Sequence, residues 1–71
     1  MREPKIGDIV LYMHSSIDKI VRFPAVITAI ETSPAVQLAV FNGALGQTVY
    51  CRSEHGIQDG GWSYSGEFGV Q

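Results

Sequence analysis

The chain has 71 residues and a formal net charge of −2, and its single cysteine, Cys51, excludes an intrachain disulfide. The five Lys and Arg residues are scattered, so the chain lacks the clustered positive charge with which duplex-binding proteins neutralise phosphates. No apolar run approaches the roughly 20 residues of a membrane-spanning helix. We therefore expect neither a nucleic-acid partner nor a membrane.

Size and composition favour self-association. A chain this short buries only about 60% of the surface that its unfolded form exposes, so its core alone supplies little stability. A metal site is not expected to help, because His14, Cys51 and His55 do not have the spacing of zinc ligands. With 45% hydrophobic residues, the chain has enough apolar surface to cover a subunit interface, and we expect a homo-oligomer.

The N-terminal residues and the cysteine content indicate the compartment. Residues 1–4 contain no apolar signal-peptide region. A lone cysteine is typical of a reducing environment. We expect a cytoplasmic protein.

The first part of the chain predicts two strands. Residues 8–14 alternate so that Ile9 and Leu11 share one face with Met13, while Tyr12 and His14 share the other. Residues 15–22 are more polar, and we expect an irregular loop there, with a single short helical turn as the alternative. Residues 23–30 predict the second strand, with Pro24 suited to a strand start or an edge position.

The middle of the chain predicts a turn at residues 31–34 and a third strand at residues 35–41. In that strand Val36, Leu38 and Val40 lie on one face. Asn42-Gly43 is a strong hairpin-turn signal.

The last part of the chain predicts a fourth strand at residues 47–52 and a polar loop at residues 53–61. Trp62, Ser63 and Tyr64 alternate and predict a short last strand. Residues 65–71 are spaced by glycines, and we expect a loosely held tail.

Five short strands separated by turns predict an all-β fold. At this length a small five-stranded SH3-like barrel fits best, as a single domain over residues 1–71 with its core in residues 4–64. An OB-fold is the second choice, because it usually needs more chain and a helix.

Four segments also carry a resemblance to known proteins. They are Gly-Asp-Ile-Val-Leu-Tyr at 7–12, Pro-Ala-Val-Ile-Thr-Ala-Ile at 24–30, Val-Gln-Leu-Ala-Val-Phe-Asn at 36–42 and Gly-Gly-Trp-Ser at 60–63. Their order and spacing resemble a family of small SH3-like barrel proteins of unknown function found in bacteriophages, prophages and some bacteria. The family pattern usually ends in a tryptophan, a second aromatic residue and a proline. Here Trp62 and Tyr64 take the aromatic places, but no proline follows.

The resemblance spans roughly residues 4 to 64 and implies an SH3-like fold and a phage-linked origin. It implies no activity, so it assigns no catalytic residue to this chain. The protein would then act in the cytoplasm of a bacterial host.

No catalytic constellation is recognisable in the sequence. The chain has two histidines, His14 and His55, the residue type most often used as a general acid or base. Cys51 and Ser53 are close to His55 in sequence, but Cys51 alternates with Val49 on a strand face that we expect to be buried, which favours a structural thiol. The chain has no nucleophile elbow, metal motif or phosphate-binding loop. We expect a protein that is not an enzyme and needs no cofactor or metal.

Aromatic and cationic side chains form the candidate binding set. Tyrosine and tryptophan rings on strands often line a shallow groove in which a planar ligand stacks, and an arginine beside them can bind a phosphate. The alternative is that Trp62 fills one end of the core while the tyrosines cover it. The candidate ligand-binding residues are Tyr12, His14, Arg22, Tyr50, Arg52, Trp62 and Tyr64.

Two functions fit this pattern. The first is a phage or prophage binding protein that sequesters a small anionic ligand, such as a nucleotide immune signal, and so counters host defence. The second is a protein-interaction module that inhibits a host defence protein or serves as an adaptor in phage assembly, with an exposed aromatic patch as its docking site.

Overall fold

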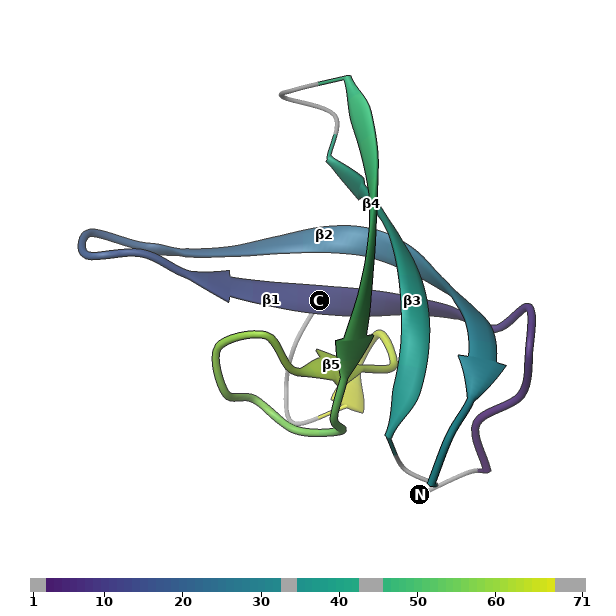
Figure 1. The fold of residues 1–71 in the computed structure, drawn as a ribbon. Coiled ribbons are helices and arrows are strands. Elements are labelled where there is room, and N and C mark those ends of the chain that lie inside the picture. Colours follow the sequence, from purple (N-terminus) through teal and green to yellow (C-terminus); the bar gives the residue numbers. More distant parts are fainter. Residues whose placement is uncertain (1–2, 33–34, 43–45, 68–71) are drawn as a thin grey trace.

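The computed structural model describes residues 3–32, 35–42 and 46–67. These residues contain the strands β1 (Ile9–Ser15), β2 (Ile20–Ile30), β3 (Val36–Asn42), β4 (Gln47–Ser53) and β5 (Trp62–Ser63). The strands pair antiparallel in one five-stranded sheet of order β4-β3-β2-β1-β5, in which the last strand returns to the first (Figure 1). The predicted all-β class is confirmed. The described part of the chain contains no helix long and apolar enough to cross a membrane.

Strands β1 and β2 form a long hairpin that projects from the rest of the molecule (Figure 1). The prediction of an irregular loop at residues 15–22 is wrong, because pairing continues out to Ser15 opposite Ile20. The turn is closed at its base by Ser16, whose backbone N–H and hydroxyl both donate to the carbonyl oxygen of Lys19. The β-branched residues Ile20 and Val21 extend the second strand. The tip is solvated, and Ile17 there is fully exposed.

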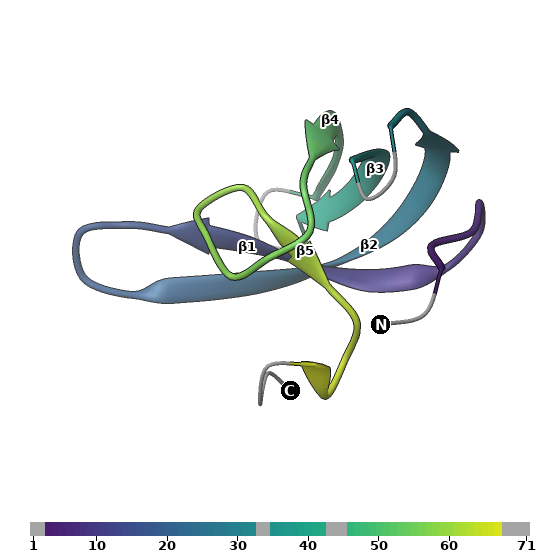
Figure 2. The ribbon, with the colours of Figure 1, turned by 90° about the horizontal axis from the view of Figure 1, so that it is seen from below.

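Pro24 marks the point at which the hairpins separate. Pairing between β2 and β3 reaches Ala25 opposite Val40 and goes no further toward the hairpin tips, although β3 itself runs on to Asn42. Pro24 has no N–H to donate to another strand, so it is tolerated where β2 pairs with β1 alone. Beyond this point the β3–β4 hairpin diverges from the β1–β2 hairpin (Figures 1 and 2).

Strand β2 is bent as well as long. Its register with β3 shifts between Ile27 and Ala29, which leaves Thr28 as an extra residue. The Thr28 hydroxyl donates to the carbonyl oxygen of Gln37 across the irregularity. A bulge of this kind increases strand twist and bending, and Figure 2 shows β2 curving around the sheet.

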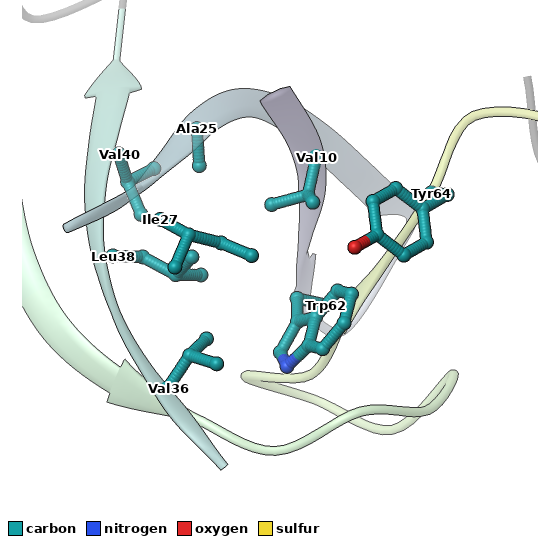
Figure 3. Close-up of a cluster of buried hydrophobic side chains, with 8 residues drawn as sticks. All are labelled: Val10, Ala25, Ile27, Val36, Leu38, Val40, Trp62 and Tyr64. Atoms are coloured by element: carbon teal, nitrogen blue, oxygen red, sulfur yellow. The ribbon is translucent and has the colours of Figure 1, made fainter. Parts of the chain in front are cut away.

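The core lies on the concave side of this curved sheet, between β3 and β5 (Figure 3). The predicted inward face of β3 is confirmed, because Val36, Leu38 and Val40 are all buried. Trp62 is 0% exposed and meets Tyr64 edge to face, with ring centroids 5.3 Å apart. The core cluster consists of Val10, Ala25, Ile27, Val36, Leu38, Val40, Trp62 and Tyr64.

The segment between β4 and β5 is a loop, as predicted, and it is tied to the sheet. Gly60 donates its N–H to the carbonyl oxygen of Met13, and the Met13 N–H donates to Gly61. The Ser53 hydroxyl donates to the Gly60 carbonyl oxygen at 2.6 Å. A side chain at Gly61 would begin 2.5 Å from the carbonyl oxygen of Gly56, so glycine is required for this close approach. Gly60 lies at φ 81°, a conformation that favours glycine.

Three sequence-based predictions fall partly on residues outside the described ranges. Ser33 and Pro34 of the expected turn and Gly43 of the expected Asn-Gly hairpin are among them. In the expected tail, residues 65–67 form a turn after Tyr64, and the Glu67 carboxylate accepts the Tyr64 N–H at 2.9 Å. Residues 68–71 lie outside the described part of the chain.

Candidate functional site

A groove opens between the two hairpins, where Pro24 lets them diverge. We call it the inter-hairpin groove. It encloses about 190 Å³, and most of its exposed lining is apolar. Strands β1 and β2 supply one wall and strands β3 and β4 supply the other. The lining residues are Tyr12, His14, Phe23, Val40, Asn42, Val49 and Cys51.

The strand register explains how these side chains meet. Tyr12 is directly opposite Phe23 in the β1–β2 ladder, so their rings belong to the same face of that hairpin. Val40 is directly opposite Val49 in the β3–β4 ladder and supplies the second wall in the same way. The groove is therefore made from two cross-strand pairs, one from each hairpin.

The Tyr12 hydroxyl lies beside the Cys51 thiol, where the two walls approach each other. Burial raises the pKa of Tyr12, and the neighbouring Cys51 and Asp59 raise it further. The phenol therefore stays protonated at neutral pH and can serve a ligand as a neutral hydrogen-bond donor or acceptor. Cys51 is half-buried, but Val49 on the same strand face is 44% exposed, so the prediction that this face is buried is wrong at Val49.

A second, polar hollow also has Tyr12 in its lining and lies between the end of β4 and the loop before β5. Its charged lining residues are Arg52, Glu54 and Asp59. Arg52 Nε is 2.9 Å from Glu31 Oε1, and Arg52 Nη1 is 3.2 Å from Glu54 Oε2. The hydrogen bonds to Glu31 and Glu54 raise the pKa of Arg52. The guanidinium therefore stays positively charged, and it already pairs with two carboxylates.

The structure distributes the seven predicted site residues over several places. Tyr12 and His14 line the inter-hairpin groove together. Arg52 lies in the polar hollow that adjoins it. Arg22 is exposed on the projecting part of β2, opposite Met13, and Tyr50 is 74% exposed on β4. The groove lining contains neither of these two side chains.

Trp62 and Tyr64 belong to the core instead of the groove. Trp62 is fully buried and Tyr64 nearly so, which leaves their rings little surface for a ligand. The Tyr64 hydroxyl donates to Asp8 Oδ2 at 2.7 Å and is thereby satisfied within the protein. These positions fit the alternative in which aromatic side chains of this set fill the core.

Sequence reasoning missed five lining residues of the groove: Phe23, Val40, Asn42, Val49 and Cys51. Phe23 could have been identified from the register of the β1–β2 hairpin. A four-residue turn at residues 16–19 places residues 12 and 23 opposite each other. The expectation of an irregular loop did not fix this register. Pro24 is the one sequence feature that indicates where the two hairpins diverge.

A half-buried histidine–carboxylate pair lies beside the core residue Trp62. His55 Nε2 is 2.9 Å from Glu67 Oε1, and the His55 ring meets the Trp62 ring edge to face. Burial alone would raise the pKa of Glu67, but hydrogen bonds from His55 and from the Tyr64 N–H outweigh it and hold that pKa below its ordinary value of 4.5. The pair fastens the turn after Tyr64 to the loop before β5.

This pair predicts an acid-dependent stability. A lowered carboxylate pKa stabilises the folded state fully above pH 4.5, and this contribution is lost as the pH falls through the lower folded-state value. Glu67→Gln should therefore reduce the loss of melting temperature on acidification from about pH 6 to about pH 3. Glu3→Gln, at an exposed position, is the matched control. Equal pH dependence in the wild type and Glu67→Gln would contradict this role.

Comparisons with known proteins and tests for metal ligands give no further assignment. No protein-family model, curated protein or solved structure matches this chain. Within the described residues, no group of three or more His, Cys, Asp or Glu side chains is placed to hold a metal ion.

Proposed function

We propose that this chain is a non-enzymatic protein-interaction module whose inter-hairpin groove accepts a large apolar side chain of a partner protein. The observation that carries the proposal is the groove itself, with Tyr12, Phe23 and Val49 around an open apolar hollow. Ligand sites of this kind combine apolar walls with a few polar groups that fix orientation. Here the Tyr12 hydroxyl and the side chains of His14 and Asn42 supply the polar groups.

The size of the groove favours a side chain over a whole nucleotide. Its volume of about 190 Å³ is below the range of about 300–1,000 Å³ that is typical of small-molecule pockets. An apolar cavity of about 150 Å³ is enough to hold a benzene ring. The groove therefore matches an aromatic or branched aliphatic residue presented by a protein surface or an extended peptide.

The charges around the groove also favour a protein partner over an anionic ligand. Arg52 already faces Glu31 and Glu54, and Asp59 Oδ1 lies 3.9 Å from His14 Nδ1. A phosphate at the polar hollow would have to compete with these carboxylates for cations. Sequestration of a nucleotide immune signal, the first function expected from the sequence, thus has less support than the second.

The strand arrangement supports the finer fold assignment within the same proposal. A meander of four strands whose short fifth strand returns to pair with the first is the order of an SH3-like barrel. The parallel β-bridge between His55 and Trp62 places the segment that follows β4 beside β5. This contact lies at the side of the sheet that a closed barrel would seal. The phage-linked origin rests on the sequence resemblance of residues 4–64 alone.

Peptide selection tests this proposal. Peptides selected from a random library on the immobilised protein are expected to share an aromatic or large aliphatic residue, and alanine at that residue should remove binding. A nucleotide pool offered to the protein in native mass spectrometry is expected to leave it unoccupied. A retained nucleotide whose binding is lost in Arg22→Ala or Arg52→Ala would overturn the proposal in favour of sequestration.

A further inference from the structure

We propose that the outer edge of β4 pairs with β4 of a second copy of this chain to form a twofold antiparallel dimer. Strand β4 is at the end of the sheet, with β3 as its neighbour, and across the described ranges no other strand pairs with it. An edge strand presents unpaired backbone N–H and C=O groups to solvent, and these groups are a template for another strand.

The β4 edge lacks the features by which proteins usually block such pairing. Its sequence, QTVYCRS, contains no proline and no lysine, and its pairing with β3 is continuous without a bulge. The opposite end of the sheet differs, because β5 has only two residues and is bridged on its outer side by His55. Two exposed apolar side chains, Val49 and Tyr50, also lie on β4.

The strand is self-complementary about Tyr50, its central residue. An antiparallel twofold through this point places Tyr50 opposite the second copy's Tyr50, and Val49 opposite its Cys51. Arg52 faces Thr48, so no like charges oppose each other. Cross-strand aromatic pairs and apolar pairs of this kind stabilise antiparallel sheets.

The proposed pairing also extends the inter-hairpin groove. Val49 and Cys51 line the groove from β4. Residues directly opposite each other in an antiparallel pair project to the same face, so Cys51 and Val49 of the second copy would continue the groove wall. Two grooves would then meet at the twofold axis as one longer binding surface, although the dimer itself does not depend on a groove ligand.

Sedimentation analysis with matched lysine variants tests the dimer. The wild type is expected to sediment as a dimer that dissociates on dilution. Tyr50→Lys should weaken dimerisation by about tenfold or more, because it replaces an aromatic pair with opposed like charges. Ile20→Lys, at an exposed strand position on the other hairpin, is the control and should behave as the wild type. Circular dichroism confirms that each variant is folded.

Disulfide trapping tests the register independently of groove binding. Opposed residues in antiparallel strands have Cα separations of about 4.5–5.5 Å, within the range of a disulfide. Val49→Cys should form a covalent dimer with Cys51 of the second copy under mild oxidation, whereas Val49→Cys combined with Cys51→Ser should not. A wild type that stays monomeric at high concentration would overturn the proposal. So would an equal loss of dimer in Tyr50→Lys and Ile20→Lys.

Discussion

Replacing Trp62 with alanine is expected to lower the free energy of unfolding by about 3–5 kcal/mol, the cost of truncating a large aromatic side chain in a core. Trp62 is fully buried, and it touches both the Tyr64 ring and the His55 ring. A hydrophobic core in a chain of this size rarely supplies more than about 3–5 kcal/mol. The variant should therefore be largely unfolded, which circular dichroism and urea titration would measure.

Ile20→Ala is the matched control, because it removes a large apolar side chain from an exposed strand position outside the core and away from β4. It should cost less than about 1 kcal/mol, within the range of surface and cross-strand effects. If Trp62→Ala unfolded at the same urea concentration as Ile20→Ala, the central position of Trp62 in the core would be wrong.

Val49→Asp is expected to weaken binding of a groove-selected peptide by at least about thirtyfold, or about 2 kcal/mol. Val49 is 44% exposed and lies in the apolar wall of the groove. A carboxylate there would lose solvent contact when an apolar side chain enters, and the groove lining contains no Lys or Arg side chain to pair with it. Isothermal titration of the selected peptide gives the affinity.

Thr48→Asp is the matched control for this variant. Thr48 precedes Val49 on β4, is exposed and projects to the opposite face of the strand, so the same carboxylate is introduced without entering the groove. Peptide affinity should stay close to that of the wild type. Equal losses in Val49→Asp and Thr48→Asp would show that general charge or strand stability controls binding, and the groove assignment would fail.

The sequence predicts the strands well because their side-chain pattern is regular. The alternation of Val36, Leu38 and Val40 correctly indicates the inward face of β3. It does not indicate the bulge at Thr28 or the length of the β1–β2 hairpin, since both depend on pairing with residues distant in sequence. The more polar composition of residues 15–22 predicted a loop, yet Ser15 pairs with Ile20 across the turn and residues 20–22 belong to β2.

The candidate site depends more on tertiary arrangement than on local pattern. Tyr12 and His14 were expected on one strand face, and they do line the groove together. The other expected aromatic residues lie in different parts of the structure. The alternation of side chains along a strand does not by itself determine whether a ring faces the core or solvent. Trp62 faces the core, whereas Tyr50 faces solvent. The groove arises where the pairing between β2 and β3 ends, next to Pro24, and this is a consequence of the fold as a whole.

The most direct test of the groove uses its own thiol. Cys51 is the one cysteine of the chain and lines the inter-hairpin groove beside Tyr12, so its alkylation by iodoacetamide reports on access to that groove. The rate would be measured with and without a saturating amount of a library-selected peptide. We predict that the bound peptide slows alkylation strongly. An unchanged rate with the peptide fully bound would place the binding site elsewhere and contradict the proposed function of the groove.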